Sequence, residues 1–219
     1  MITVHHLDNS RSQRILWLLE ELGVAYDIKP YKRAKNLLAP PELKAIHPLG
    51  KSPVISDNGR VIAETGAIMD YVLTNYGGGR LVPQAGTEAR LDYTYWMYAA
   101  EGTFMTPLLL KLVAEGMRQR TPWPVKPVAW AIAGSLEKTL VKAPLAAIFD
   151  LWAAALNKAP YFAGQAFSAA DVMMSFPVEA ATARAGAVDR PEIKSWVERM
   201  HARPAYQAAL KRGGPYAYA

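Results

Sequence analysis

The chain has 219 residues and a net charge of +6; 51% of its residues are hydrophobic and 20% are charged. This balance excludes wholesale disorder, which requires few apolar residues and a large excess of one charge. The sequence contains no cysteine, which excludes disulfides, thiolate metal sites and a protein thiol as nucleophile.

The first eighty residues alternate between strand-like and helix-like patterns. They predict strands over 2–7, 25–31, 52–57 and 60–63, helices over 12–23 and 65–76, and a short helical turn over 42–46. Asn58-Gly59 is typical of a two-residue hairpin turn between the last two strands. The first two strands need a crossover and therefore run parallel. The order predicts a mixed four-stranded sheet with helices on both faces.

The rest of the chain reads as helical. We expect helices over 87–118, bent at Gly102 and Pro107, and over 127–157, interrupted near Pro144. Shorter helices are expected over 168–186, 191–202 and 204–210, the first opened by a capping box of Ser168 and Asp171. We therefore predict an α/β domain over residues 1–79, a linker over 80–86 and an all-α domain over 87–219.

Charge and hydropathy narrow the class of partner. Residues 1–79 hold 9 basic and 8 acidic side chains, and residues 80–219 hold 16 and 11, with no basic run longer than two. Nucleic-acid binders concentrate such charge on one face, so no nucleic-acid partner is expected, and the excess favours anionic small molecules. No uncharged apolar stretch reaches ~18 residues and no signal-peptide pattern opens the sequence, so we expect a cytoplasmic protein with no membrane partner.

The turn over residues 8–12 is the first candidate site. It joins the first strand to the first helix, where open α/β sheets bind ligands against free backbone N–H groups. Ser10 either faces such a ligand or caps the helix, and for Ser12 a capping role is favoured.

Two further junctions carry candidate residues. A cis Ser52-Pro53 bond would leave the Ser52 backbone free to pair with an extended peptide. Glu64 could accept a hydrogen bond from an amine, and Thr65 either caps the following helix or receives a carboxylate.

Together these segments resemble the cytosolic glutathione S-transferases, in particular a serine-type, bacterial or fungal-like branch. The resemblance covers essentially the whole chain and implies a thioredoxin-like β-α-β-α-β-β-α domain followed by an all-α domain. The motifs that carry it are Ser10-Arg11-Ser12-Gln13-Arg14 with the helix to Gly23, His47-Pro48-Leu49-Gly50-Lys51-Ser52-Pro53-Val54, Glu64-Thr65, and Phe167-Ser168-Ala169-Ala170-Asp171.

The resemblance implies a role for each candidate. The Ser10 hydroxyl would donate to the sulfur of glutathione, with Ser12 and Asn9 as alternatives. The backbone of Ser52, held by cis Pro53, would pair with the cysteinyl unit. Glu64 and Thr65 would bind the γ-glutamyl amine and carboxylate, and Lys51 is a candidate for the glycyl carboxylate. A homodimer that uses glutathione as co-substrate, acts on small apolar electrophiles and serves detoxification is also implied.

The proposed chemistry needs no histidine and no metal. A thiol of pKa ~8.5 is only a few per cent thiolate at neutral pH, and lowering that pKa by about two units requires ~2.7 kcal/mol. One hydroxyl donor and a helix N-terminus can supply this. We therefore interpret the four histidines (His5, His6, His47 and His201) as structural. No metal-ligand spacing is present.

Three other functions stay open at this point. They are a non-catalytic protein that binds glutathione or apolar ligands, a glutathione-dependent peroxidase, and a dimerising adaptor. The electrophile would bind against the all-α domain, where Tyr98, Met105 and Leu109 are possible contacts.

Overall fold

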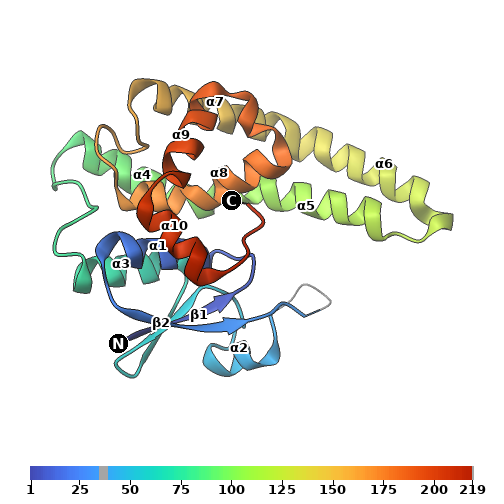
Figure 1. Cartoon of the computed structure of the whole chain (residues 1–219). Coiled ribbons are helices and arrows are strands. Elements are labelled where there is room, and N and C mark those ends of the chain that lie inside the picture. Colours follow the sequence, from blue (N-terminus) through green and yellow to red (C-terminus); the bar gives the residue numbers. More distant parts are fainter. Residues whose placement is uncertain (35–38, 219) are drawn as a thin grey trace.

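The structure is a computed structural model that describes residues 1–34 and 39–218. Within these residues the chain forms one mixed sheet in the order β2-β1-β3-β4 (Figure 1). β1 and β2 are parallel, and β3 is antiparallel to both β1 and β4. The predicted sheet is confirmed. The strands are β1 (Ile2–Leu7), β2 (Tyr26–Tyr31), β3 (Val54–Asp57) and β4 (Arg60–Ala63).

Three helices accompany the sheet: α1 (Ser12–Leu22), α2 (Pro41–Ile46) and α3 (Thr65–Tyr76). α1 ends at Gly23, whose φ of 62° is left-handed and whose N–H donates to the carbonyl of Glu20, as expected for a helix-ending glycine. The hairpin turn also follows the prediction, because Asn58 and Gly59 both have positive φ, 48° and 78°.

Side-chain alternation along β1 divides the helices between the two faces of the sheet. Ile2 and Val4 join the main core with residues of α1 and α3, whereas Leu7 packs in a separate small cluster with Leu43 of α2. The same alternation sends His6 toward α1, where it contacts Ser12, while His5 contacts Tyr31 and Ser56. The main core continues into the helical part of the chain, which packs on α1 and α3 (Figure 1).

The helical part follows the predicted extents with two differences. The stretch predicted over 87–118 is two helices separated at Thr103 and Phe104, and Pro107 lies in the first turn of the second, where proline is tolerated. The stretch predicted over 127–157 continues through a π-helical turn just before Pro144. The elements are α4 (Glu88–Gly102), α5 (Met105–Arg120), η1 (Trp123–Val125), α6 (Lys126–Leu136), η2 (Glu137–Val141), α7 (Lys142–Lys158), α8 (Ala169–Ala185), η3 (Ala187–Asp189), α9 (Pro191–His201) and α10 (Pro204–Gly213).

α5 and α6 form a hairpin that extends away from the rest of the molecule (Figure 1). Trp123 at its tip is 85% exposed. By length and composition alone the segment Trp123–Lys158 could cross a membrane, a criterion that core helices of soluble proteins also meet. Its later part does belong to the protein core, since Ile148 and Trp152 are buried there.

The predicted capping box at the start of α8 is present and extends into a larger network. The N–H of Ser168 donates to the Asp171 carboxylate at 3.0 Å, and Ser168 Oγ accepts from the N–H of Ala170. Asp171 also accepts from the backbone N–H of Phe162 at 3.0 Å and from the indole of Trp196 at 3.2 Å. Asp171 therefore connects α8 to α9 through Trp196, and to the loop before α8 through Phe162.

A buried arginine connects α1 to the helical part. Arg14 is 1% exposed, donates to the backbone carbonyl of Met173 in α8 at 2.6 Å, and forms an ion pair with Glu101 in α4. In a regular helix the N–H of residue 177 would donate to that carbonyl, but residue 177 is Pro, which has no N–H. Arg14 thus supplies the donor that the proline removes.

Candidate functional site

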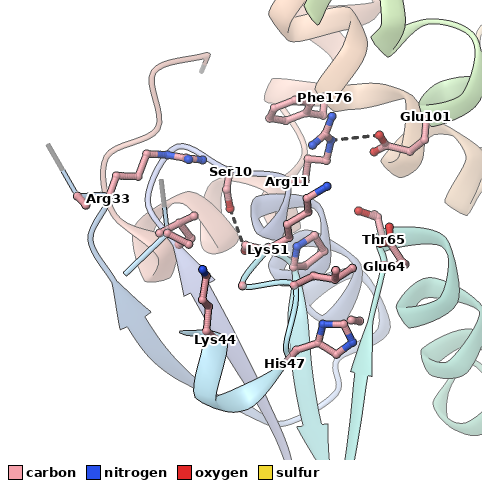
Figure 2. Close-up of a pocket in the computed structure, with 18 of the residues that line it drawn as sticks. Ser10, Arg11, Arg33, Lys44, His47, Lys51, Glu64, Thr65, Glu101 and Phe176 are labelled. Atoms are coloured by element: carbon pink, nitrogen blue, oxygen red, sulfur yellow. Dashed lines mark hydrogen bonds and ion pairs between the residues drawn. The ribbon is translucent and has the colours of Figure 1, made fainter. Parts of the chain in front are cut away.

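A cavity of about 950 Å³ opens beyond the carboxyl end of β1. Figure 2 shows Phe176 and Glu101 on one side of it and Lys44 and His47 on the other. All six residues predicted for the site line this one cavity, although they come from three separate junctions of the chain. They are Ser10, Lys51, Ser52, Pro53, Glu64 and Thr65.

Ser10 precedes the first turn of α1. Its Oγ accepts a hydrogen bond from the backbone N–H of Ser12 at 3.2 Å. The N-cap residue of α1 is Arg11, and Ser12 is already the first helical residue. The predicted capping role of Ser12 is therefore wrong, because α1 begins one residue earlier than the Ser-Arg-Ser pattern suggests. The Ser10 hydroxyl, and not that of Ser12, accepts from a backbone N–H at the start of the helix.

The three alternative thiolate partners have different surroundings. Ser10 lines the cavity and contacts Ser12 Oγ at 2.8 Å and Ser52 Oγ at 3.1 Å (Figure 2). Ser12 is fully buried behind it and contacts Nδ1 of His6 at 2.8 Å. The Asn9 side chain accepts from the backbone N–H of Ala217 at 2.8 Å, in the segment after α10. Among the three, Ser10 is the residue that faces the cavity.

The segment before β3 contributes the second group. The Ser52-Pro53 peptide bond is cis, as the sequence suggested. Lys51 is exposed, and its side chain points across the cavity beneath Arg11 in Figure 2. The basic side chain of Lys51 thus lies at the cavity next to the backbone of Ser52 and Pro53.

The start of α3 contributes the third group. Glu64 is the N-cap residue and has φ 72° and ψ 130°, a conformation that L-residues rarely adopt. Thr65 is the first helical residue, so the alternative in which it caps α3 is wrong; its hydroxyl accepts from Arg14 at 3.3 Å. Strained backbone at a cavity wall is typical of a functional position.

Several lining residues are not among the site residues predicted from the sequence. Lys44 and His47 reach the cavity from α2 and the residues after it, because α2 packs beside the sheet edge. The described residues of the helical part that line the cavity are Glu101 and Phe176; the suggested contacts Tyr98, Met105 and Leu109 do not take part. Glu101 lies in α4 one helical turn after Tyr98, so the prediction chose the correct helix but a residue one turn away from the one that lines the cavity.

Charge inside the site is largely paired on the side of the helices. The Arg11 guanidinium lies 3.1 Å from Glu101 and 5.2 Å from the ring centre of Phe176 (Figure 2). Burial lowers the pKa of Arg14, and Glu101 beside it acts in the opposite direction. Lys44 and Lys51 also line the cavity, and their positive charges can attract anionic groups of a ligand.

The site can bind an anionic ligand and donate hydrogen bonds to it. A hydroxyl at the start of α1 and the backbone N–H groups at the start of α3 can receive negative charge. Within the part of the chain that the structure describes, no group of three or more His, Asp and Glu residues could hold a metal ion.

Comparison with known proteins gives a consistent result. The family model "Glutathione S-transferase, N-terminal domain" matches residues 1–74, and "Glutathione S-transferase, C-terminal domain" matches residues 123–204. Glutathione S-transferase 1 of Saccharomyces cerevisiae is 32% identical, over 97% of this chain and 95% of the yeast protein. Glutathione S-transferase 3 of Schizosaccharomyces pombe is 34% identical, over 97% of this chain and 88% of the S. pombe protein. A crystal structure of a glutathione S-transferase from Actinobacillus pleuropneumoniae superposes with a TM-score of 0.77 at 31% identity, over 100% and 95% of the two chains.

Proposed function

Because the chain belongs to the glutathione S-transferase family and is a glutathione transferase, we propose that it joins the thiolate of glutathione, its co-substrate, to small apolar electrophiles. We assign it to the serine-type enzymes, with Ser10 as the residue that donates to the sulfur. The observation that carries this proposal is the position of the Ser10 hydroxyl, which faces the cavity at the start of α1.

The remaining predicted residues would hold the tripeptide. The backbone of Ser52 pairs with the cysteinyl unit, and Lys51 attracts the glycyl carboxylate. Glu64 accepts from the γ-glutamyl amine, and the N–H and hydroxyl of Thr65 donate to its carboxylate. The Thr65 hydroxyl keeps this capacity, because it accepts from Arg14 and its own proton stays free for a ligand. The positive φ of Glu64 supports the same assignment, since strain of this kind persists where function requires it.

The energy required is within reach of these groups. Hydrogen bonds to a charged group contribute ~1.5–3 kcal/mol, and a helix N-terminus adds up to about 1 kcal/mol at such a site. Their sum is comparable to the ~2.7 kcal/mol that lowers a thiol pKa by two units. A bound thiol would then be largely ionised at neutral pH without a protein thiol or a metal.

The test is a comparison of Ser10→Ala with the wild type. We expect the pKa of bound glutathione, followed by the ultraviolet absorbance of its thiolate, to rise by about one to two units. Turnover of an aromatic chloride at pH 6.5 should fall about 10- to 100-fold, with glutathione affinity changed little. Ser56→Ala, which removes a hydroxyl in β3 that contacts His5, is the matched control.

Three results would contradict the proposal. Unchanged turnover and thiol pKa in Ser10→Ala would exclude Ser10 and return attention to Ser12 or Asn9. Retention of the wild type on immobilised glutathione with no turnover of aromatic chlorides or peroxides would indicate a binding protein instead. Turnover of peroxides alone would indicate a peroxidase.

We further propose that the protein is a cytoplasmic homodimer that serves detoxification, with domains over 1–79 and 87–219 joined by 80–86. Support for the dimer comes from α4, where Leu91, Tyr95 and Tyr98 follow one another on a single face and are 71%, 48% and 78% exposed. Sedimentation of Tyr98→Asp should give a smaller species than the wild type. A wild-type monomer would contradict this assembly.

A further inference from the structure

A row of hydrogen bonds runs inward from the cavity to a buried imidazole. Ser10 Oγ contacts Ser12 Oγ at 2.8 Å, and Ser12 Oγ contacts Nδ1 of His6 at 2.8 Å. The three residues are 4%, 0% and 6% exposed. Ser10 lines the cavity and the other two residues lie behind it. A buried titratable group is therefore connected to the proposed thiolate site through two hydroxyls.

The fold explains how this row arises. Side-chain alternation places His6 on the face of β1 that α1 covers, and Ser12 is the first residue of α1. α10 approaches the ring from another side: a Cβ on Gly213 would lie 3.4 Å from Nε2 of His6 and 2.6 Å from Oε1 of Gln13, so a larger residue there would displace the Gln13 side chain. The ring also has a hydrogen bond with the Gly213 backbone.

The two hydroxyls give the row two possible directions, because each hydroxyl carries one proton. When the imidazole is neutral and Nδ1 accepts from Ser12, Ser12 accepts from Ser10, and the Ser10 proton points inward. When the ring is protonated, Nδ1–H donates to Ser12, Ser12 donates to Ser10, and the Ser10 proton points into the cavity. The second direction is the one in which Ser10 donates to a thiolate. The alternative acceptor for Ser12, the carbonyl of Leu7, is further away at 3.4 Å.

We propose that His6 takes up the proton of the glutathione thiol through Ser10 and Ser12, and that this transfer turns the Ser10 hydroxyl toward the thiolate. The proposal rests on the function assigned to Ser10 above. The S–H bond breaks and its proton binds Ser10 Oγ; the Ser10 proton moves to Ser12 Oγ, and the Ser12 proton moves to Nδ1. One proton leaves sulfur and one arrives at His6, so the products are a thiolate and an imidazolium, and no co-reactant is needed.

The surroundings of the ring suit this role. Burial lowers the pKa of His6, so the ring is neutral while the cavity holds no anion, and the Gly213 backbone and the Asp8 carboxylate act in the opposite direction. The two other side chains that lie beside Gly213 at this point, Gln13 and Leu16, carry no charge. A thiolate near Ser10 would add the negative charge that stabilises the protonated ring. His6 is thus a positioning residue that acts through the two serines, and its interpretation as merely structural is replaced.

The direct test is the protonation of His6 in the wild-type protein. Histidine ¹⁵N resonances are recorded at pH 7.5 without ligand, with glutathione, and with S-methylglutathione, which binds without a thiol proton. We expect the His6 ring to become doubly protonated with glutathione and to stay neutral with S-methylglutathione. A His6 ring that stays neutral with glutathione, or that is protonated equally by both ligands, would overturn the proposal.

Variants provide a second readout. His6→Asn leaves a donor for Ser12 that cannot take up a proton, and Ser12→Ala interrupts the row. Each should raise the pKa of the bound thiol by about one unit and slow turnover about tenfold at pH 6.5, with the loss recovering at high pH. His5→Asn is the matched control, because His5 lies next in β1, faces the other side of the sheet and contacts Tyr31 and Ser56; its thiol pKa should equal that of the wild type.

The variants also separate this inference from the proposed function. If Ser10→Ala raises the thiol pKa while His6→Asn and Ser12→Ala leave it unchanged, the relay is wrong and the role of Ser10 stands. If Ser10→Ala leaves the thiol pKa unchanged, the proposed function itself fails.

Discussion

The pairing of Arg14 with a helix proline leads to a quantitative prediction about stability. Pro177 removes the donor that would satisfy the Met173 carbonyl inside α8, and Arg14 satisfies it from α1 at 2.6 Å. Replacing Arg14 with Met keeps a side chain of similar length but leaves that carbonyl without a partner. Replacing Pro177 with Ala restores an N–H at the correct position. The two substitutions should therefore be coupled.

The magnitude follows from the environment of each group. A buried carbonyl without a partner costs about 1–3 kcal/mol. Losing the ion pair with Glu101 adds little, because Glu101 is partly exposed and removal of the buried Arg14 charge relieves its own desolvation. Arg14→Met should thus lower the free energy of unfolding by about 1–3 kcal/mol. Pro177→Ala should stabilise the Arg14→Met protein by about 1–2 kcal/mol more than it stabilises the wild type.

Urea denaturation of the wild type, the two single variants and the double variant measures this coupling. Arg80→Met serves as the control, since Arg80 donates at 2.8 Å to the carbonyl of Leu22 at the end of α1, and residue 26, four residues after Leu22, is Tyr and not Pro. Arg80→Met and Pro177→Ala should be additive. Additivity of Arg14→Met and Pro177→Ala within about 0.5 kcal/mol would refute the idea that Arg14 compensates for the proline.

Three further predictions concern the helical part and the strained cavity wall. Asp171→Ala should lower the free energy of unfolding by about 2–4 kcal/mol, which is more than the ~0.5–2 kcal/mol that a helix cap alone contributes. The extra loss is expected because the backbone N–H of Phe162 and the indole N–H of Trp196 also lose their acceptor. A loss below about 1 kcal/mol in chemical denaturation would contradict this prediction. Burial raises the pKa of Asp171 from 3.8 to about 6, so between these pH values the native state binds more protons than the unfolded state. The stability of the wild type relative to Asp171→Asn should therefore fall as the pH rises from about 3.8 to about 6, and stay constant above that. A relative stability that rises over this range in pH-dependent melting would contradict the prediction. Glu64→Gly should stabilise the fold by about 1 kcal/mol by relieving its positive φ and weaken glutathione binding, whereas Asn58→Gly, in the hairpin turn, should leave the affinity measured by calorimetry unchanged.

The elements that could be predicted from the sequence are those whose signals are local. The apolar period and Gly23 define α1, and Asn58-Gly59 defines the hairpin, because each depends on neighbouring residues alone. The capping role predicted for Ser12 and the capping alternative for Thr65 fail for the same reason, because a hydroxyl residue at the start of a helix fits the N-cap and the first helical position equally well in sequence.

Contacts between distant residues carried no such signal. The sequence shows that Pro177 interrupts a helix but not that an arginine 163 residues earlier satisfies the released carbonyl, 159 residues from it. The sequence does not relate His6 to its partners, because Ser12 reaches the ring from α1 and Gly213 approaches it from α10. The six candidate residues were brought together by resemblance to a family, and no spacing rule would have gathered them.

The walls of the cavity differ in how firmly they are anchored, and this bears on which substrates the enzyme can accommodate. On one side, Phe176 belongs to α8, whose residues 169–181 are all buried. On the other side, α2 has Leu43 as its one buried residue, in a cluster apart from the main core. A bulky substrate would therefore displace α2 before it displaced α8. Substitutions at the five other residues of α2 would therefore alter this wall of the cavity and leave the packing of the interior unchanged.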